Sequence, residues 1–282
     1  MSMQSARIHI SGIVQGVGFR PFVYNLATRL GLRGWVRNTS AGVDIEVDGE
    51  HDVLVAFIHA VRSEAPALSH IEELTSSFGG AHGFRSFEII HSESLDSAFQ
   101  PISPDVAVCD DCLRELFDPS DRRYHYPFIN CTNCGPRFTI IKDIPYDRPQ
   151  TTMAPFAMCQ DCEREYTDPS NRRFHAQPVA CPSCGPRVWL ERQGTQRAAE
   201  ADAIQQTRQL LAQGQIVAIK GLGGFHLACD ATRAGPVAEL RARKLRVDKP
   251  FALMMPDLET IERHCFVSRT ERELLVSSAR PI

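Results

Sequence analysis

The chain has 282 residues, 43% of them hydrophobic, and its 31 basic and 34 acidic side chains give a net charge of -3. Because single domains cluster at about 100–200 residues, this length predicts two or three domains with packed cores. The balanced charge argues against a general nucleic-acid surface. No stretch approaches the roughly 20 apolar residues of a membrane span, and no apolar signal segment is visible, so we expect a cytoplasmic protein without membrane contact.

The elements expected in the first segment, residues 5–91, follow the order β-α-β-β-α-β, which is the ferredoxin-like arrangement. Alternating polar and apolar residues predict the strands, and apolar residues at helical spacing predict the helices. The strands are expected at 7–10, 34–38, 43–47, 71–78 and 84–90, and the helices from Pro21 to Leu30 and at 54–61.

A glycine loop separates the first expected strand from the first expected helix. Glycines allow several backbone N–H groups to point into one concavity, and the start of the helix adds a partial positive charge. Arg20 can offer a planar fork to phosphate oxygens, and we expect its side chain to be partly exposed. The residues alone leave a simple turn as the alternative. The predicted phosphate-binding residues are Gln15, Gly16, Val17, Gly18, Phe19 and Arg20.

The run from Gln15 to Arg20, with Asn38 further along the chain, resembles the acylphosphatase signature. The resemblance covers residues 5–91. In that family the loop and the arginine hold the phosphate, and the asparagine orients the attacking water. The resemblance therefore implies that Arg20 and Asn38 are catalytic. Such a site can suffice because an acyl phosphate is already activated, so positioning and charge stabilisation do most of the work. Without the resemblance, Asn38 would be interpreted as a turn residue at a strand end.

Eight of the ten cysteines form four Cys-x-x-Cys pairs within residues 105–190. In a long chain this spacing indicates metal binding, and two such pairs complete a closed tetrahedron around zinc. We therefore predict two structural zinc ions per chain. The remaining Cys229 and Cys265 are expected to be buried free thiols. The predicted ligands are Cys109, Cys112, Cys131 and Cys134 in residues 109–134, the first cysteine module, and Cys159, Cys162, Cys181 and Cys184 in residues 159–184, the second.

The two cysteine modules are an internal repeat with an offset of 50 residues throughout. His125 and His175 occupy equivalent positions. Because each module already has four sulfurs, we expect surface or neighbouring roles for both histidines rather than ligation. The repeat favours modules that each close on themselves, although the spacing also allows a cross-braced pairing.

The last segment, residues 200–282, shows an α/β pattern. Its basic residues either compensate the partial negative charge at the C-terminal end of a helix or form a site for polyphosphate. The candidates for nucleotide binding are Lys220, Lys244, Arg246 and Lys249. Helices are expected at 198–213 and 236–244, a buried strand at 216–220, a glycine-rich loop at 221–230 and another strand at 251–255.

The runs Lys220–Asp230 and Arg243–Pro250 resemble the YrdC-type domain. That resemblance implies ATP with Mg, and it makes double-stranded RNA an additional partner to consider. The chain has acylphosphatase, tandem zinc and YrdC-like parts in that order. By this order it resembles the N-terminal part of the HypF family of hydrogenase-maturation carbamoyltransferases. Since the YrdC-like part looks incomplete, we expect a truncated chain whose last segment is poorly stable.

The family resemblance implies hydrolysis of carbamoyl phosphate by the first domain. In the complete protein it further implies formation of a carbamoyl-adenylate and carbamoyl transfer to the C-terminal cysteine of a HypE-type maturation protein. The predicted fold class is α+β: a ferredoxin-like acylphosphatase domain, a small tandem zinc-finger domain and an incomplete α/β YrdC-like region. The alternative is a zinc-dependent RNA-binding module with a vestigial acylphosphatase domain.

Overall fold

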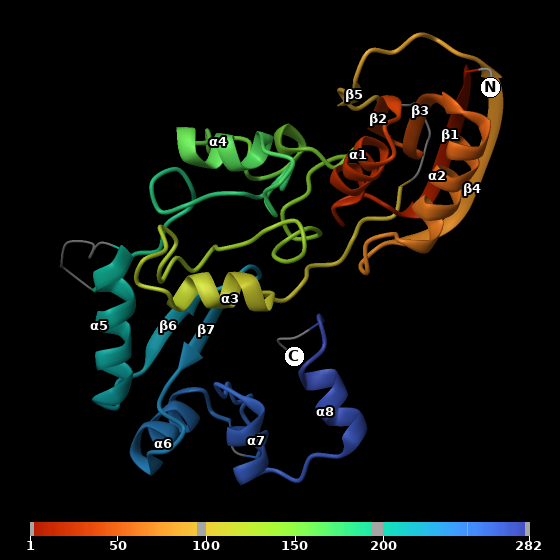
Figure 1. The fold of residues 1–282 in the computed structure, drawn as a ribbon. Helices are drawn as coiled ribbons and strands as arrows, with labels where there is room; N and C mark the ends of the chain where they lie inside the picture. Colours follow the sequence, from red (N-terminus) through yellow and green to blue (C-terminus); the bar gives the residue numbers. More distant parts are fainter. Residues whose placement is uncertain (1–2, 95–99, 193–199, 247, 280–282) are drawn as a thin grey trace. The chain divides into compact units, whose positions relative to one another are not determined.

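The computed structural model describes residues 3–94, 100–192, 200–246 and 248–279. It divides into two compact units, the first ending at Pro186 and the second beginning at Arg187 (Figure 1). The first unit therefore contains both the predicted ferredoxin-like segment and the two cysteine modules.

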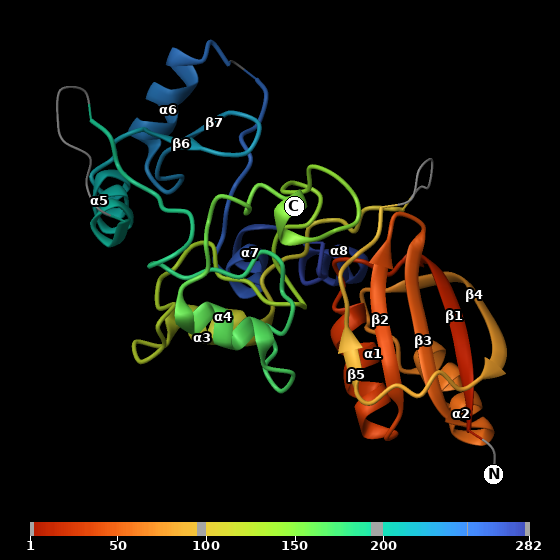
Figure 2. The same ribbon diagram turned by 90° about the horizontal axis from the view of Figure 1, so that it is seen from above.

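The first unit begins with a five-stranded sheet in the order β4-β1-β3-β2-β5, with α1 and α2 against one face (Figure 2). All neighbouring strands are antiparallel except β2 and β5, which are parallel. This arrangement confirms the predicted ferredoxin-like fold. The strands are β1 (Met3–Ile13), β2 (Arg33–Thr39), β3 (Gly42–Glu50), β4 (His70–Gly80) and β5 (Phe87–Ile89), and the helices are α1 (Phe19–Arg29) and α2 (His51–Ser63).

Alternation along the strands builds the core between the sheet and its helices. In β3 the side chains of Val43, Ile45 and Val47 are fully buried, because successive residues of a strand point to opposite faces. Helix α1 begins at Phe19, two residues earlier than Pro21 led us to expect. Gly18 precedes it with a φ of 76°, a left-handed conformation that lets the loop turn directly into the helix.

The two cysteine modules have the same local structure. Helices α3 (Asp110–Phe117) and α4 (Gln160–Thr167) each start directly after the first cysteine of their module. His125 and His175 follow with positive φ values of 56° and 53°, and each backbone N–H donates to a carbonyl of the preceding helix at 2.9 Å. Residues 135–158, the inter-module segment, link the modules and contain the short 3-10 helix η1 (Arg148–Gln150).

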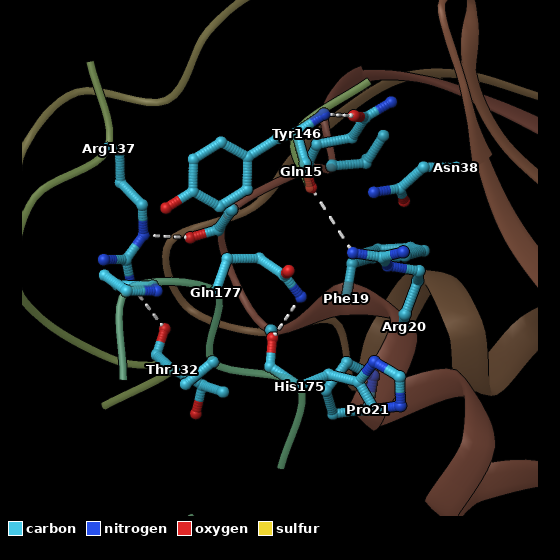
Figure 3. A pocket seen from close by; sticks show the side chains of 15 residues that line it. Gln15, Phe19, Arg20, Pro21, Asn38, Thr132, Arg137, Tyr146, His175 and Gln177 are labelled. Carbon is cyan, nitrogen blue, oxygen red and sulfur yellow. Dashed lines mark hydrogen bonds between the residues drawn. The ribbon is translucent and has the colours of Figure 1, made fainter. Parts of the chain in front are cut away.

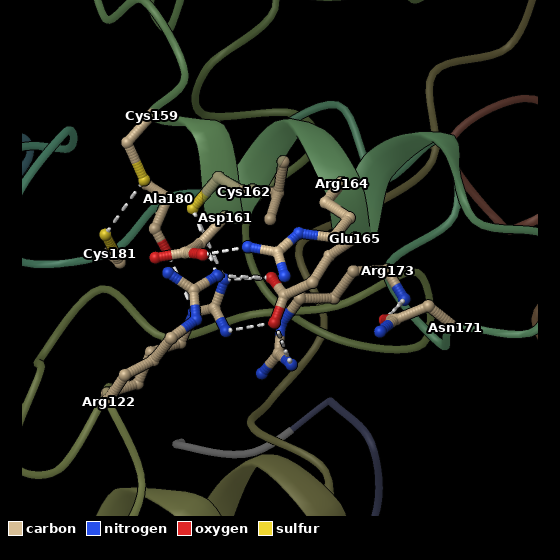
Figure 4. A network of polar contacts seen from close by, with 12 residues as sticks. Arg122, Cys159, Asp161, Cys162, Arg164, Glu165, Asn171, Arg173, Ala180 and Cys181 are labelled. Atoms are coloured by element: carbon tan, nitrogen blue, oxygen red, sulfur yellow. Dashed lines mark hydrogen bonds and ion pairs between the residues drawn. The ribbon is translucent and has the colours of Figure 1, made fainter.

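Each cysteine module supplies an arginine pair to the other module, and Figure 4 shows the contacts around Glu165. Arg122 and Arg123 of the first module bind Glu165 on α4, each at 2.5 Å, and Arg122 also donates to Cys162 Sγ at 3.4 Å. Arg172 and Arg173 of the second module make the equivalent contacts with Glu115 on α3 and with Cys112 Sγ. The modules therefore form a pseudo-symmetric pair.

Charge pairing dominates the environment of Glu165. Burial would by itself raise the pKa of this carboxyl group, but the hydrogen bonds from Arg123 and Arg122 outweigh burial and lower the pKa to about 2. The Arg123 side chain is only 1% exposed, so its charge depends on this carboxylate for compensation.

The second unit contains a two-stranded antiparallel sheet and four helices in the part of the chain that the structure describes. Gly221 N–H donates to Gly224 O at 2.7 Å, so part of the expected glycine-rich loop is the turn of a hairpin. The elements are α5 (Glu200–Ala212), β6 (Val217–Lys220), β7 (Phe225–Ala228), α6 (Ala234–Arg243), α7 (Leu258–His264) and α8 (Arg269–Leu275).

Several expectations for this unit are wrong. Strand β6 pairs with β7 alone among the described residues, so only Val217 of the expected buried strand is buried. No strand forms at 251–255, and the ring of Phe251 lies instead against the guanidinium groups of Arg241 and Arg246. Cys265 is exposed and Cys229 is half-buried, so neither is a buried thiol. The expected start of the first helix at Ala198 lies outside the described residues.

Replacing Glu165 by Gln should destabilise the paired modules by about 3 kcal/mol, because it leaves the Arg123 charge buried without its counter-charge. A thermal melt should show a lowered Tm. The matched control is Glu163→Gln, an exposed position on the same helix, which should leave the Tm unchanged. Equal melting temperatures for the two variants would contradict the reciprocal pairing.

Candidate functional site

The glycine loop that precedes α1 forms one wall of a small cavity of about 30 Å³ (Figure 3). Gly16 and Gly18 both have positive φ values, 72° and 76°, which side chains other than glycine rarely adopt. The first N–H groups of a helix have no acceptor within the helix, so the start of α1 is suited to an anion. The side chains of Val17 and Phe19 are buried in the core, which leaves only their backbone to contact a ligand.

Arg20, the second residue of α1, lies in this cavity and is 8% exposed. The expectation that its side chain is partly exposed is therefore wrong. Its Nη2 donates to Asp147 Oδ1 at 2.7 Å and to the Tyr146 carbonyl at 3.4 Å, and its Nη1 donates to Ser92 Oγ at 3.3 Å. The inter-module segment buries the arginine and supplies its carboxylate partner.

Asn38, near the end of β2, lies beside Arg20 in the same cavity and is 1% exposed. With its amide oxygen turned toward the arginine, it accepts from Arg20 Nε and Nη2, both at 3.2 Å. The amide NH2 group is then left to contact a ligand or a water. The structure thus brings the two predicted catalytic residues together.

Gln15 has a different role from the one its place in the loop suggests. Its side-chain NH2 group donates to the carbonyls of Thr39 and Gly42 at 2.7 and 2.9 Å, and its Oε1 accepts from Tyr146 N–H at 2.9 Å. With the amide engaged at both ends, Gln15 joins the loop to the sheet and to the inter-module segment. Only its backbone is left to contact a phosphate.

Arg137 joins the glycine loop to the first cysteine module. Its Nε donates to the Gly16 carbonyl, and its Nη groups donate to four carbonyls between Cys131 and Pro136. Its side chain is almost fully buried, whereas the equivalent Arg187 of the repeat is exposed. The sequence repeat gave no sign of this difference, because both arginines occur in the same Gly-Pro-Arg motif.

The opposite wall of the cavity comes from the cysteine modules and the segment between them, which sequence reasoning missed. Chain separations above 100 residues made these contacts invisible in local patterns. The residues on this wall are Thr132, Arg137, Tyr146, His175, Ala176, Gln177 and Pro178.

His175 is half-buried in the cavity, while the equivalent His125 is exposed and stacks on Tyr124. Burial, together with the neighbouring charge of Arg20, lowers the pKa of His175 from 6.5 to about 4. The imidazole is therefore neutral at neutral pH, with one donor and one acceptor nitrogen.

The eight cysteines form two four-sulfur clusters, each made within one module. In the first, Cys131 Sγ lies 3.7 Å from Cys109 Sγ and 3.9 Å from Cys134 Sγ. In the second, the sulfur distances are 3.6 and 3.7 Å. A tetrahedron with zinc–sulfur bonds of about 2.3 Å has edges of about 3.8 Å, so both clusters fit zinc. The pairing is sequential rather than cross-braced, and neither His125 nor His175 belongs to a cluster.

The four basic residues predicted to bind nucleotide lie in the second unit. Arg246 Nε donates to the Lys249 carbonyl at 3.2 Å, which brings these two residues together. Lys220 lies on β6 with its ammonium group 5.2 Å from the centroid of the Phe225 ring, and Lys244 is exposed directly after α6. A nucleotide site at these residues stays a prediction. In the described parts of the chain, no helix has the length and apolarity needed to cross a membrane.

The environment of His175 predicts a pH-dependent stability of the fold. The unfolded chain binds a proton on His175 near its ordinary pKa of 6.5, but the folded chain does so only near 4. The free energy of unfolding is therefore highest above the unfolded pKa of 6.5, where His175 is neutral in both states. It falls as the pH is lowered toward 4, because only the unfolded chain then binds the proton. Between pH 7 and 5.5 the loss should be about 1 kcal/mol. Thermal melts at both pH values should show a smaller Tm difference in His175→Gln than in the parent. His125→Gln should keep the parent difference, and equal behaviour of the two variants would count against the buried neutral imidazole.

Three family models match the chain in order. The Acylphosphatase model matches residues 6–89, the HypF finger model matches residues 108–141 and 158–191, and the Telomere recombination model of the Sua5/YciO/YrdC proteins matches residues 209–282. The acylphosphatase of Pseudothermotoga lettingae is 38% identical over 89 residues, which are 31% of this chain and 99% of that protein.

Longer relatives match almost the whole chain. Carbamoyltransferase HypF2 of Cupriavidus necator is 54% identical over 278 residues, which cover 98% of this chain and 34% of that protein. A crystal structure of full-length HypF in the phosphate- and nucleotide-bound form superimposes with a TM-score of 0.93 at 52% identity, covering 100% of this chain and 37% of that one. The chain thus spans about a third of the length of these relatives. By these matches and by its fold, the chain belongs to the HypF carbamoyltransferase family.

Proposed function

We propose that the first domain hydrolyses an acyl phosphate, namely carbamoyl phosphate, at Arg20 and Asn38. The observation that carries this proposal is the convergence of the glycine loop, the start of α1, Arg20 and Asn38 on one cavity. The match to the Acylphosphatase model over these residues supports it.

We infer a task in the hydrolysis for each of these groups. The phosphoryl group binds to the loop N–H groups and to the Arg20 guanidinium, which stabilise the charge of the transition state. The Asn38 NH2 group holds the attacking water in line with phosphorus. Water and the acyl phosphate give phosphate and a carboxylate, here carbamate, and the leaving carboxylate needs no proton from the protein. In the free site Asp147 compensates the buried Arg20 charge, so an incoming phosphate takes over the position of that carboxylate.

In the complete protein, the carbamate would be joined to ATP, with Mg, to give a carbamoyl-adenylate, and the carbamoyl group would pass to the C-terminal cysteine of a HypE-type maturation protein. The carbamoyltransferase names of the relatives and the nucleotide-bound form of a full-length HypF support this assignment. Lys220, Lys244, Arg246 and Lys249 remain our candidates for the nucleotide phosphates. We place the protein in the cytoplasm.

We further propose that each cysteine module holds one structural zinc ion. The four sulfurs of a module fill a tetrahedral shell, so no position is left for a substrate or a reactive water. The metal would bring the folding energy that a short polar module cannot obtain from its own core.

Replacing Arg20 by Gln should lower the rate of carbamoyl phosphate hydrolysis by about 10²–10³-fold, because one oriented charged donor to the transition state is lost. The Tm should also fall, since Asp147 then loses its partner in a buried setting. Asn38→Ala should lower kcat while leaving KM for the acyl phosphate close to the parent value. Steady-state hydrolysis of carbamoyl and acetyl phosphate, beside thermal melts, measures both effects.

The control for Arg20 is Arg29→Gln, at the exposed end of the same helix, which should keep the parent activity. If Arg20→Gln hydrolyses carbamoyl phosphate at the parent rate, the site lies elsewhere.

Metal analysis of the purified chain should give two zinc ions per chain, and chelation should unfold the modules. A zinc content below about one ion per chain, with the melting curve unchanged by a chelator, would exclude structural zinc in both modules.

A further inference from the structure

We propose that the two cysteine modules form the acyl-group half of the acyl-phosphate site, and that His175 contacts the acyl group and selects a small, hydrogen-bonding one such as carbamoyl. This inference rests on the proposed hydrolysis at Arg20 and Asn38 and extends it to substrate selection by a part of the chain outside the acylphosphatase domain.

The cysteine modules cover the side of the glycine loop from which an acyl group would project. A Cβ atom added at Gly16 would lie 3.2 Å from Arg137 Cδ and 3.5 Å from the Tyr146 ring. A Cβ atom at Gly18 would lie 3.5 Å from Thr132 Cβ. Residues of the modules therefore lie against the loop and line the same cavity, as the side chains in Figure 3 show, so a phosphoryl group held by the loop would have the modules beside its acyl group.

This cover is bonded to the acylphosphatase domain on two sides. On one side Tyr146 N–H donates to Gln15, and Arg137 donates to the Gly16 carbonyl. On the other side the second module packs against α1, where the rings of Tyr24 and Phe174 lie 5.4 Å apart at 66°. Because contacts join the two walls at both edges, the fold fixes the distance between the walls, and this distance limits the size of the acyl group that can enter.

Most polar side chains on the module wall already have partners. The hydroxyl of Thr132 donates to the Arg172 carbonyl at 2.8 Å, and the amide of Gln177 bonds to Tyr166 Oη, the His175 carbonyl and Arg148 N–H. Among the hydrogen bonds of the described residues, none uses a ring nitrogen of His175. Its imidazole thus has unused hydrogen-bonding capacity on this wall.

A neutral imidazole is complementary to a carbamoyl group, because that group has both an NH2 donor and a carbonyl acceptor. An acetyl group offers no donor, and a benzoyl group offers none either and needs more room beside His175. A site built to bond a substrate N–H discriminates against analogues that lack it, since its own polar group is then left unpaired.

The repeat offers a matched control for the test. His125 has the same backbone conformation as His175 but faces solvent, so the backbone cost of replacing either histidine is the same. We would measure kcat/KM for carbamoyl, acetyl and benzoyl phosphate in the parent and in three variants: His175→Ala, His175→Phe and His125→Ala. Thermal melts of the same samples show whether each variant is folded.

In His175→Ala the preference for carbamoyl over acetyl phosphate should fall about tenfold or more, and benzoyl phosphate should become a better substrate than it is for the parent. His175→Phe should lose the carbamoyl preference but still exclude benzoyl phosphate, because it keeps a ring and removes both nitrogens. His125→Ala should match the parent with all three substrates.

Parent ratios among the three substrates in folded His175→Ala and His175→Phe would overturn the assignment of His175 while leaving hydrolysis at Arg20 intact. A parent protein that hydrolyses none of the three above the spontaneous rate would overturn the proposed function and this inference together.

Discussion

The reciprocal bonds between the arginine pairs and glutamates of the two cysteine modules are the contacts on which the candidate site depends. Arg122 and Arg123 reach Glu165, and Arg172 and Arg173 reach Glu115, so neither module holds its charges without the other. The paired modules place Thr132 and His175, which lie on different modules, on one wall of the cavity. A closed metal shell in each module would anchor helix α3 or α4, which carries Glu115 or Glu165. Metal binding would thus be linked to substrate selection through the Arg–Glu contacts between the modules.

Local patterns in the sequence predicted much of the first unit. The alternation of Val43, Ile45 and Val47 identified a strand with one buried face, and the ferredoxin-like order followed from the strand runs together with two helical stripes. The cysteine spacing predicted two four-sulfur clusters, and the geometry removed the cross-braced alternative. These successes share one property: each signal lies within a single short stretch of the chain, such as 109–134 or 43–47, where periodicity and ligand spacing act.

The features that local patterns could not predict all depend on contacts between distant parts of the chain. The burial of Arg20 comes from Asp147, which follows it by more than 100 residues. The apolar run at 216–220 indicated a buried strand, but burial depends on what covers a strand, and β6 pairs with β7 alone among the described residues. The expectation for 251–255 failed for the same reason, because β propensity requires a partner edge to become a strand.

The exchange of arginines between the modules also restricts how a duplicated sequence can diverge. A substitution at Glu165 leaves the arginines of the other module unpaired, so the two copies must change together at the positions that join them. Positions outside these reciprocal contacts escape this restriction. His125 and His175, or Arg137 and Arg187, can therefore acquire separate tasks while the joint between the copies stays the same. Duplication followed by asymmetric docking onto one domain is thus a route by which a structural metal-binding unit can become part of an active site.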